Sequence, residues 1–317
     1  MDGMDAVSTA TATAFAGLSR SRSRPREWRA EEYQSSLGFV PKLAGRVVEW
    51  LGVEGDDKVL DLGCGDGTLD IEIGRVLAKG GGKLLGLDRS ASMIKAAREN
   101  VRRGEVGLER KCLFIVADTS NLLSHAAMVQ QPEHFTKVFS SAAIHWMLGE
   151  GGSQEGPVSK RGKTFFEGVR YVLKPGGKFV FEMGGMGNIA EARAAMVGVV
   201  ARALGETPEK IKEPWFFPDE EWVREMLEVK VGGFEVERSE MEWRPTKIDG
   251  KGGLEGWVRL IGGQLFYLIG GEKEREEAVR EVVRLLEVVC RREPAREGGE
   301  VEYVVNYVRL RVVARRL

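Results

Sequence analysis

Three glycines at alternate positions, Gly63, Gly65 and Gly67, follow an apolar stretch in the segment VLDLGCGDGTLDIEIG, residues 59–74. Glycine has no Cβ atom, so the backbone there can adopt unusual dihedrals and a ligand can approach the main chain closely. The helix expected after the glycines would add backbone N–H groups without partners. The dinucleotide-binding pattern needs a glycine at the sixth position, which is Thr68 here. The spacing therefore disfavours a dinucleotide, and by itself it also fits a loop that is merely tight.

Acidic residues stand at the ends of the next two predicted strands, Asp88 in LLGLDRS and Asp118 in FIVADTS. A carboxylate at the first of these places can accept hydrogen bonds from both hydroxyls of a ribose. Asp118 could accept a hydrogen bond from an adenine amino group, with Arg89 and Met93 packed along the ring. A single Asp is more often a helix N-cap or a turn residue. One acid at each of three successive strand ends, counting Asp61 beside the glycines, favours a nucleoside site.

Short apolar segments alternate with helix-like segments along the first part of the chain. Helical spacing occurs at 68–78, 91–103 and 163–173, and the last of these helices is expected to end at Pro175. Strands alternating with helices predict a parallel sheet covered on both faces. The predicted strands are residues 58–62, 83–88, 112–118, 137–142 and 177–183.

Two longer alternating segments, 234–245 and 301–316, predict an antiparallel pair that closes the sheet. The fold class is therefore α/β, a Rossmann-like seven-stranded, mostly parallel sheet with helices on both faces. The surplus helical stretches predict a cap over the carboxyl edge, formed by insertions at about 188–230 and 246–298. We expect one domain over 28–317 and a disordered tail over 1–27.

Composition excludes several classes of protein. The chain has 47 basic and 48 acidic residues in 317, so its global charge does not favour binding to nucleic acid or to a membrane surface. It has no apolar run of the roughly 18 residues that a spanning helix needs. Its three cysteines are odd in number and widely spaced, which disfavours disulfides and a cysteine zinc site, and we expect no metal. These features favour the cytoplasm, although the Arg- and Ser-rich tail also resembles a mitochondrial targeting peptide.

At this point the chain resembles the class I S-adenosylmethionine-dependent methyltransferases over nearly everything from Trp28 to the C-terminus. The segments that carry the resemblance, in order and spacing, are VLDLGCGDG, LLGLDRSASMI, IVADTSNL, VFSSAAIHWM and VLKPGGKFVFEMGGMGN. More narrowly, SAAIHW followed by FEMGG, with Trp28 and Tyr33 before them, is similar to the trans-aconitate methyltransferase-like branch and its fungal relatives. That branch methylates small molecules.

The resemblance implies S-adenosyl-L-methionine as cofactor and assigns roles by position. Ser141 stands where relatives often have Asn, so a backbone carbonyl is the contact expected there. The implied cofactor residues are Gly63, Cys64 and Gly65 at the methionine part, Asp61 near its ammonium, Asp88 at the ribose, Asp118 and Thr119 at the adenine, and Tyr33 closing over the cofactor.

Three residues are candidates for the methyl-transfer step. His145 directly follows the fourth predicted strand, at the rim where the methyl group should lie; it would orient the acceptor, or act as a base if the acceptor is a hydroxyl. Trp146 beside it is either an aromatic wall or ordinary core. Arg259, on the predicted cap, could grip a carboxylate bidentately, although a cap arginine is usually a solvated charge.

Three functions stay open on the sequence. We favour a small-molecule O-methyltransferase that acts on a carboxylate or a related oxygen. The second is methylation of carbon, nitrogen or nucleic acid, against which the missing N-P-P-Y-type signature and the missing basic stripe count. The third is a non-catalytic scaffold that binds S-adenosylmethionine. The acceptor itself and the oligomeric state are not encoded in any pattern that we identify.

Overall fold

The computed structural model describes residues 45–104, 107–149, 158–248, 250, 252–294, 296 and 301–317. The predicted tail, Trp28 and Tyr33 lie outside these residues. The structure has a central sheet with strand order β3-β2-β1-β4-β5-β8-β6, and the two-residue strand β7 pairs with β8 outside this order. The strands are β1 (Lys58–Leu62), β2 (Lys83–Asp88), β3 (Cys112–Val116), β4 (Phe135–Ser141), β5 (Leu173–Gly184), β6 (Phe234–Lys247), β7 (Arg291–Arg292) and β8 (Glu302–Arg316).

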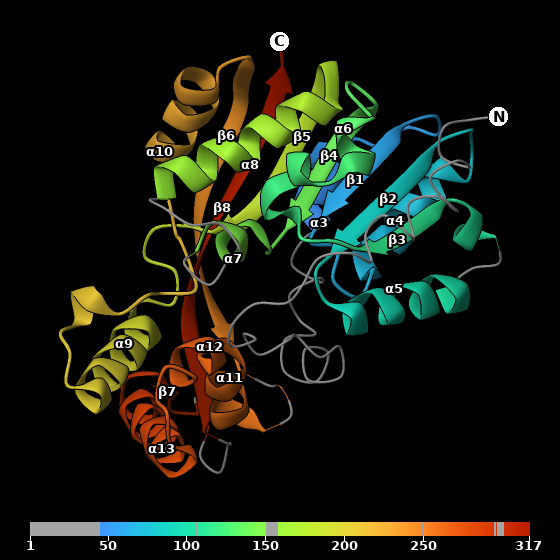
Figure 1. Cartoon of the computed structure of the whole chain (residues 1–317). Helices are drawn as coiled ribbons and strands as arrows, with labels where there is room; N and C mark the ends of the chain where they lie inside the picture. Colours follow the sequence, from blue (N-terminus) through green and yellow to red (C-terminus); the bar gives the residue numbers. More distant parts are fainter. Residues whose placement is uncertain are drawn as a thin grey trace.

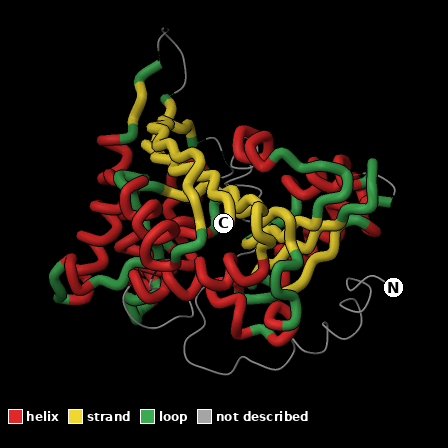
Figure 2. The backbone as a smooth tube through the Cα atoms, turned by 90° about the horizontal axis from the view of Figure 1, so that it is seen from above, coloured by secondary structure: helices red, strands yellow, loops and turns green. Residues whose placement is uncertain are grey.

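Strands β1 to β5 run parallel, and β8 pairs antiparallel with both β5 and β6. The sheet is thus mostly parallel with an antiparallel pair at one edge. Seen from above, the strands form one twisted band with helices on both sides (Figure 2). The predicted fold class is confirmed.

Each face of the sheet has its own hydrophobic core. On one face, α8 contributes Phe165 and Phe166 to a cluster with β1, β4 and β5. On the other, α4 and α5 contribute Ile73 and Ile94 to a cluster with Val59 and Phe139. Because both faces are covered, the strands are apolar almost throughout, as expected for a parallel sheet. The covering helices are α3 (Gly45–Leu51), α4 (Thr68–Leu77) and α5 (Ala91–Gly104) on one face, and α6 (Ala126–Val129), α8 (Val158–Val172) and α10 (Glu220–Arg224) on the other.

The cap is built on an extension of the antiparallel pair. Strand β5 ends at Gly184, opposite Arg309, whereas β6 and β8 stay paired as far as Lys247 and Val304. This extension carries Val305 and Tyr307 into a third core, which it shares with the cap helices. Figure 1 shows these helices together at the far end of β6 and β8. They are α9 (Ala190–Leu204), α11 (Gly253–Ile261), α12 (Gly263–Phe266) and α13 (Glu272–Val289).

One part of the expected cap insertion lies elsewhere. The segment Glu220–Val231, helix α10 and the π-helical turn after it, packs its side chains into the core under α8 and β6 rather than into the cap. The sequence pattern could not tell a helix in the cap from a helix against the sheet, since in both places a helix buries one apolar face. Among the described residues, every helix is too short or too polar to cross a membrane.

Candidate functional site

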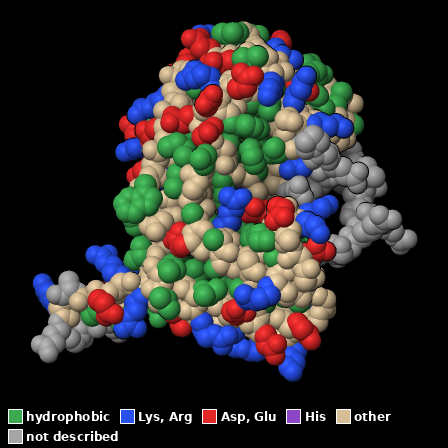
Figure 3. Space-filling model, turned by 90° about the vertical axis from the view of Figure 1, so that its left-hand side faces the viewer, with side chains coloured by type: hydrophobic (Ala, Val, Ile, Leu, Met, Phe, Trp, Pro, Cys, Tyr) green, Lys and Arg blue, Asp and Glu red, His purple; other side chains and the backbone are tan. Residues whose placement is uncertain are grey.

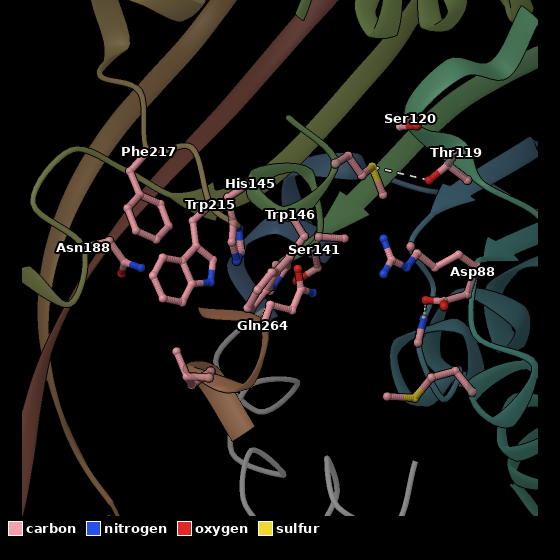
Figure 4. Close-up of a pocket in the computed structure, with 18 of the residues that line it drawn as sticks. Asp88, Thr119, Ser120, Ser141, His145, Trp146, Asn188, Trp215, Phe217 and Gln264 are labelled. Atoms are coloured by element: carbon pink, nitrogen blue, oxygen red, sulfur yellow. Dashed lines mark hydrogen bonds between the residues drawn. The ribbon is translucent and has the colours of Figure 1, made fainter. Parts of the chain in front are cut away.

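A cavity lies where the carboxyl ends of the parallel strands face the cap. Its lining includes Ser141 at the end of β4 and Gln264 on α12. In Figure 4, aromatic side chains and Asn188 lie on one side and Asp88 and Thr119 on the other. The predicted site residues that line the cavity are Gly63, Gly65, Asp88, Arg89, Met93, Asp118, Thr119, Ser141, His145 and Trp146.

The glycine turn after β1 requires glycine for two different reasons. Gly63, Gly65 and Gly67 have φ values of +78°, +56° and +72°, which side chains rarely adopt. A Cβ on Gly63 would lie 2.3 Å from the Cβ of Ala143, so this position must let α7 (Ile144–Leu148) approach. A Cβ on Gly65 would meet no atom within 4 Å, although Gly65 lines the cavity. Gly65 therefore keeps space open for a ligand.

Asp88 joins this turn to the end of β2. Its Oδ2 accepts a hydrogen bond from the backbone N–H of Gly65 at 3.1 Å, and its Oδ1 accepts one from Ser90 at 2.8 Å. Burial raises the pKa of Asp88, and these two hydrogen bonds oppose that rise. The carboxylate is thus held at the mouth of the cavity beside the open space at Gly65.

Asp118 has a structural role as well as a place in the cavity wall. Its Oδ1 accepts hydrogen bonds from the N–H and the hydroxyl of Ser120, at 2.9 and 2.7 Å, and so caps the 3₁₀ segment Thr119–Ser124. Thr119 donates to the sulfur of Met147 at 3.3 Å (Figure 4). The capping interpretation and the binding interpretation of Asp118 are therefore compatible.

Asp61 and Cys64 do not line the cavity, contrary to the cofactor contacts predicted for them; Asp61 is buried within β1. Burial, and next the neighbouring carboxyl of Asp70, raise the pKa of Asp61 well above its usual value. Burial raises the pKa of Asp70 to about 7. Burial and the nearby carboxylates also raise the pKa of the Cys64 thiol, which makes it a poor nucleophile.

His145 is neutral, and one tautomer is fixed. Its Nδ1 accepts a hydrogen bond from the backbone N–H of Gly184 at 3.2 Å, which leaves the proton on Nε2. Burial, and next the charge of Arg309, lower the pKa of His145 to about 3. Its ring centroid lies 5.6 Å from that of Trp146 and 5.7 Å from that of Phe217. His145 is thus a hydrogen-bond donor within an aromatic wall and is poorly suited to act as a base.

Arg259 is not brought to the cavity, contrary to its predicted role. Its guanidinium makes two hydrogen bonds with Glu276, at 2.7 and 2.6 Å, and one with Glu255 at 2.8 Å. The side chain keeps 34% of its surface exposed. Since α11 turns this face toward α13, Arg259 ties two cap helices together instead of gripping an acceptor.

Sequence reasoning missed the residues that the cap and β8 bring to the cavity. Arg309 lies on β8 opposite the last residue of β5, Tyr307 lies on the extended part of β8, and Gln264 comes from α12. The alternation in YVRLRV placed Arg309 on one face of a strand, but did not show that this face meets the cavity. The other missed lining residues with large or polar side chains are Ser120, Met147, Asn188, Ile189, Trp215, Phe217 and Ile261.

The cavity residues fit S-adenosylmethionine. The space above Gly65, which a Cβ would enter, is bordered by the Asp88 carboxylate that the same glycine holds through its N–H. Asp118 lines the cavity at the end of the neighbouring strand. A nucleoside ligand at this edge of a sheet needs a carboxylate that accepts hydrogen bonds from the ribose hydroxyls and a glycine backbone that the rest of the ligand can approach closely.

Comparison with known proteins gives the same family. Residues 54–222 match the family described as "Methyltransferase domain". An uncharacterized methyltransferase from Schizosaccharomyces pombe is 33% identical over 291 residues, which cover 90% of this chain and 97% of that one. A 23S rRNA (uracil-C5)-methyltransferase from Shewanella halifaxensis is 37% identical over 82 residues, but these cover only 26% of this chain and 17% of that one.

Among solved structures, a candidate methyltransferase from Bacillus halodurans superposes with a TM-score of 0.51 at 16% identity. The match covers 85% of this chain and 96% of that one, and it supports the fold. Together with the family match and the full-length fungal relative, it establishes the chain as a class I methyltransferase with S-adenosyl-L-methionine as methyl donor.

Proposed function

We propose that this enzyme transfers the methyl group to a carboxylate oxygen of a small organic acid. One observation carries the proposal: among the described residues, the part of the cavity around His145 offers hydrogen-bond donors and no side chain suited to act as a base. S-Adenosylmethionine, when bound, supplies a methyl group on a sulfonium; the acceptor oxygen gives the electron pair of the new bond, and the C–S pair stays on sulfur. A carboxylate is already ionised at neutral pH, so no proton has to be removed.

The ionisable side chains of the cavity fit this chemistry. Among lining residues of the described chain, the only carboxylates are Asp88 and Asp118, at the strand ends proposed for the cofactor. Burial raises the pKa of Tyr307 to about 12, and its hydroxyl accepts a hydrogen bond from Trp257 at 2.8 Å. Neither Tyr307 nor neutral His145 would remove a proton readily at pH 7. His145 instead donates from Nε2 and orients an acceptor oxygen.

The cofactor residues predicted from the sequence belong to this proposal. Gly63, Gly65, Asp88 and Asp118 would hold S-adenosylmethionine, with the remaining predicted lining residues around them. Trp146 would form a wall of the acceptor site, since its ring lies 5.7 Å from that of Trp215. These groups align the acceptor and exclude water, which is the main requirement when the methyl group is already activated.

A small acceptor fits both the surface charge and the cap that lines the cavity. On the face that Figure 3 shows, basic and acidic side chains are interspersed rather than gathered in a basic stripe. The cap forms part of the cavity wall, because Ile261 on α11 and Gln264 on α12 line it. The resemblance to the trans-aconitate methyltransferase-like branch supports an acidic acceptor.

The test uses the purified enzyme, S-adenosylmethionine with a labelled methyl group, and a panel of small acids, phenols and amines. We expect label on acids only, in a form that mild base releases as methanol, because a methyl ester is hydrolysed by base. Base-stable label on a phenol, an amine or RNA would refute the carboxylate assignment. Tight cofactor binding without transfer to any compound would favour the scaffold instead.

A further inference from the structure

Ile189 has a backbone conformation that isoleucine rarely adopts. It lies between the end of β5 and the start of α9, with φ +47° and ψ +37°, in the left-handed region. A β-branched residue at positive φ is strained, whereas glycine adopts this conformation freely. Among the residues that the structure describes, the other non-glycine residues with positive φ are Glu133 and Ala142, and Ala142, like Ile189, lines the cavity. Backbone strain persists only where surrounding contacts enforce it, and it is often found at functional sites.

Hydrogen bonds to β8 enforce the conformation of Ile189. Strand β8 extends past the end of β5, so its backbone groups there need other partners. The N–H of Ile189 donates to the carbonyl of Asn306 at 2.9 Å, and Oε1 of Glu191 accepts a hydrogen bond from the N–H of Asn306 at 2.7 Å. Before Ile189 in the chain, Oδ1 of Asn188 accepts a hydrogen bond from the N–H of Val308 at 2.9 Å. A change in the φ angle of Ile189 would disturb these hydrogen bonds.

The side chain of Ile189 forms part of the cavity wall. It is 2% exposed and belongs to the cap core together with Trp215 and Ile261, which also line the cavity. Glycine would meet the backbone requirement at lower cost, so the conformation alone does not account for an isoleucine. What isoleucine adds is a large apolar side chain. Because a β-branched side chain has few rotamers and the backbone is tied to β8, this part of the wall is rigid.

The order of the strands places Ile189 in the half of the cavity remote from Asp88. Asp88 ends β2, and in the sheet β1 and β4 lie between β2 and β5, whose end Ile189 follows. Neighbouring strands lie about 4.8 Å apart, so these two strand ends are separated by roughly 14 Å. In Figure 4, Asn188, the residue before Ile189, lies beside Phe217 and across the cavity from Asp88. Ile189 therefore lies where an acceptor would bind rather than at the nucleoside end of the cofactor.

We propose that Ile189 determines which acceptors the enzyme takes, by forming a rigid apolar wall against the part of the acceptor that is not methylated. That part is a hydrocarbon chain or ring, because a polar group against isoleucine would lose its hydration without gaining a hydrogen bond. Its length is limited, since the wall does not move aside. An apolar pocket of this kind distinguishes ligands that differ by one methylene group. The inference rests on the proposed function for the class of acceptor that is tested first.

The test uses the purified enzyme, S-adenosylmethionine and straight-chain monocarboxylic acids from acetate to decanoate. We expect kcat/KM to rise with chain length, because each methylene group buries apolar surface, and to fall once the chain meets the wall. Ile189→Ala removes the side chain beyond Cβ and should move the maximum to a longer acid. The kcat/KM ratio between the first acid that the wild type disfavours and its best acid should rise about tenfold or more. The KM for S-adenosylmethionine should stay the same.

Two further variants separate the wall from the cap core. Ile269→Ala is the matched control, because Ile269 is 3% exposed in the same core and is not a lining residue. It should lower the melting temperature without changing the acid ratio. Ile189→Val keeps a branched side chain and removes one carbon, so it should stay folded even if the alanine variant does not. It should shift the ratio in the same direction by a smaller factor.

Several results would overturn the inference. They are an unchanged acid ratio in Ile189→Ala and Ile189→Val, an equal change in Ile269→Ala, and a wild-type enzyme that is indifferent to chain length. Methylation confined to acids that carry a second charged group at the far end would also overturn it, because that group would have to lie against the apolar wall.

The class of compound that receives the methyl group tests the proposed function separately. If phenols or amines are methylated instead of acids, the same ratio is measured with 4-alkylphenols or with straight-chain amines. A ratio that depends on Ile189 would then support the wall, although the carboxylate assignment fails. If no compound is methylated, calorimetric affinities of the acids for the enzyme loaded with S-adenosylhomocysteine replace kcat/KM. Absence of any binding would overturn the inference together with the proposed function.

Discussion

Changing Gly63 or Gly65 to alanine should impair different properties of the enzyme, stability in the first case and cofactor binding in the second. In Gly65→Ala the new methyl group meets no protein atom within 4 Å but enters the lining of the cavity. In Gly63→Ala the new Cβ would lie 2.3 Å from the Cβ of Ala143 and 3.0 Å from the terminal carbon of Met147. We expect Gly65→Ala to lose cofactor binding and keep the fold, and Gly63→Ala to lose stability.

The magnitudes follow from the backbone and from the contacts. The φ angle is +78° at Gly63 and +56° at Gly65, and an alanine in this left-handed region loses about 1–2 kcal/mol of unfolding free energy. Gly65→Ala has no other penalty, so its melting temperature should fall by roughly 2–8 °C. Gly63→Ala adds overpacking against α7 of about 1–3 kcal/mol or more, which brings the total loss of unfolding free energy to about 2–5 kcal/mol.

Thermal unfolding without ligand gives the stability of both variants, and calorimetry with S-adenosylhomocysteine gives their cofactor affinity. Wild-type affinity in Gly65→Ala would show that the cofactor does not lie against this glycine. Equal melting temperatures for the two variants would show that Gly63 is not packed against Ala143 as the structure has it. The first result would refute the argument for the cofactor site, and the second would refute the argument for the packing of the turn.

Asp88→Ala should raise the cofactor dissociation constant by roughly a hundredfold, because it removes a charged hydrogen-bond acceptor and frees the Gly65 N–H; calorimetry that finds unchanged affinity would place the ribose elsewhere. Because the pKa of His145 is about 3, kcat/KM for an acid acceptor should show no limb near pH 6.5, and His145→Gln should keep more activity than His145→Phe; a limb at that pH that the glutamine variant abolishes would restore the base role. Asp70 binds a proton more tightly in the folded state, so the unfolding free energy should fall as pH rises through about 7; urea titrations of Asp70→Asn should show a smaller fall, since the buried neighbour Asp61 still contributes, and a drop of the same size in the variant would contradict it. Arg259→Ala should lower the unfolding free energy by no more than about 1 kcal/mol, since its ion pairs are partly exposed, and a selective loss of acid binding would instead support the sequence-based role.

The strand and helix pattern was readable because it depends on local chemistry. The strands β1 and β2 begin and end where the apolar segments 58–62 and 83–88 predicted. Pro175 and the glycines after it stop α8 at Val172, because proline lacks the N–H that a helix needs. Glycine spacing and strand-end acids also identified one half of the cavity, since successive parallel strands bring their carboxyl ends to one edge by topology alone.

The other half depended on contacts between distant parts of the chain. Trp215 and Tyr307 are 92 positions apart in the sequence and line one cavity only because β8 extends beyond β5 toward the cap. Arg259 and Arg309 are alike as residue types, and only packing shows that one is paired with Glu276 on the cap while the other lines the cavity beside Glu182. The sequence thus determined the fold, the family and the cofactor edge, which follow from local periodicity. Only the tertiary structure decided which distant residues line the other half of the cavity and that His145 is neutral, because burial and the nearby charge of Arg309 lower its pKa.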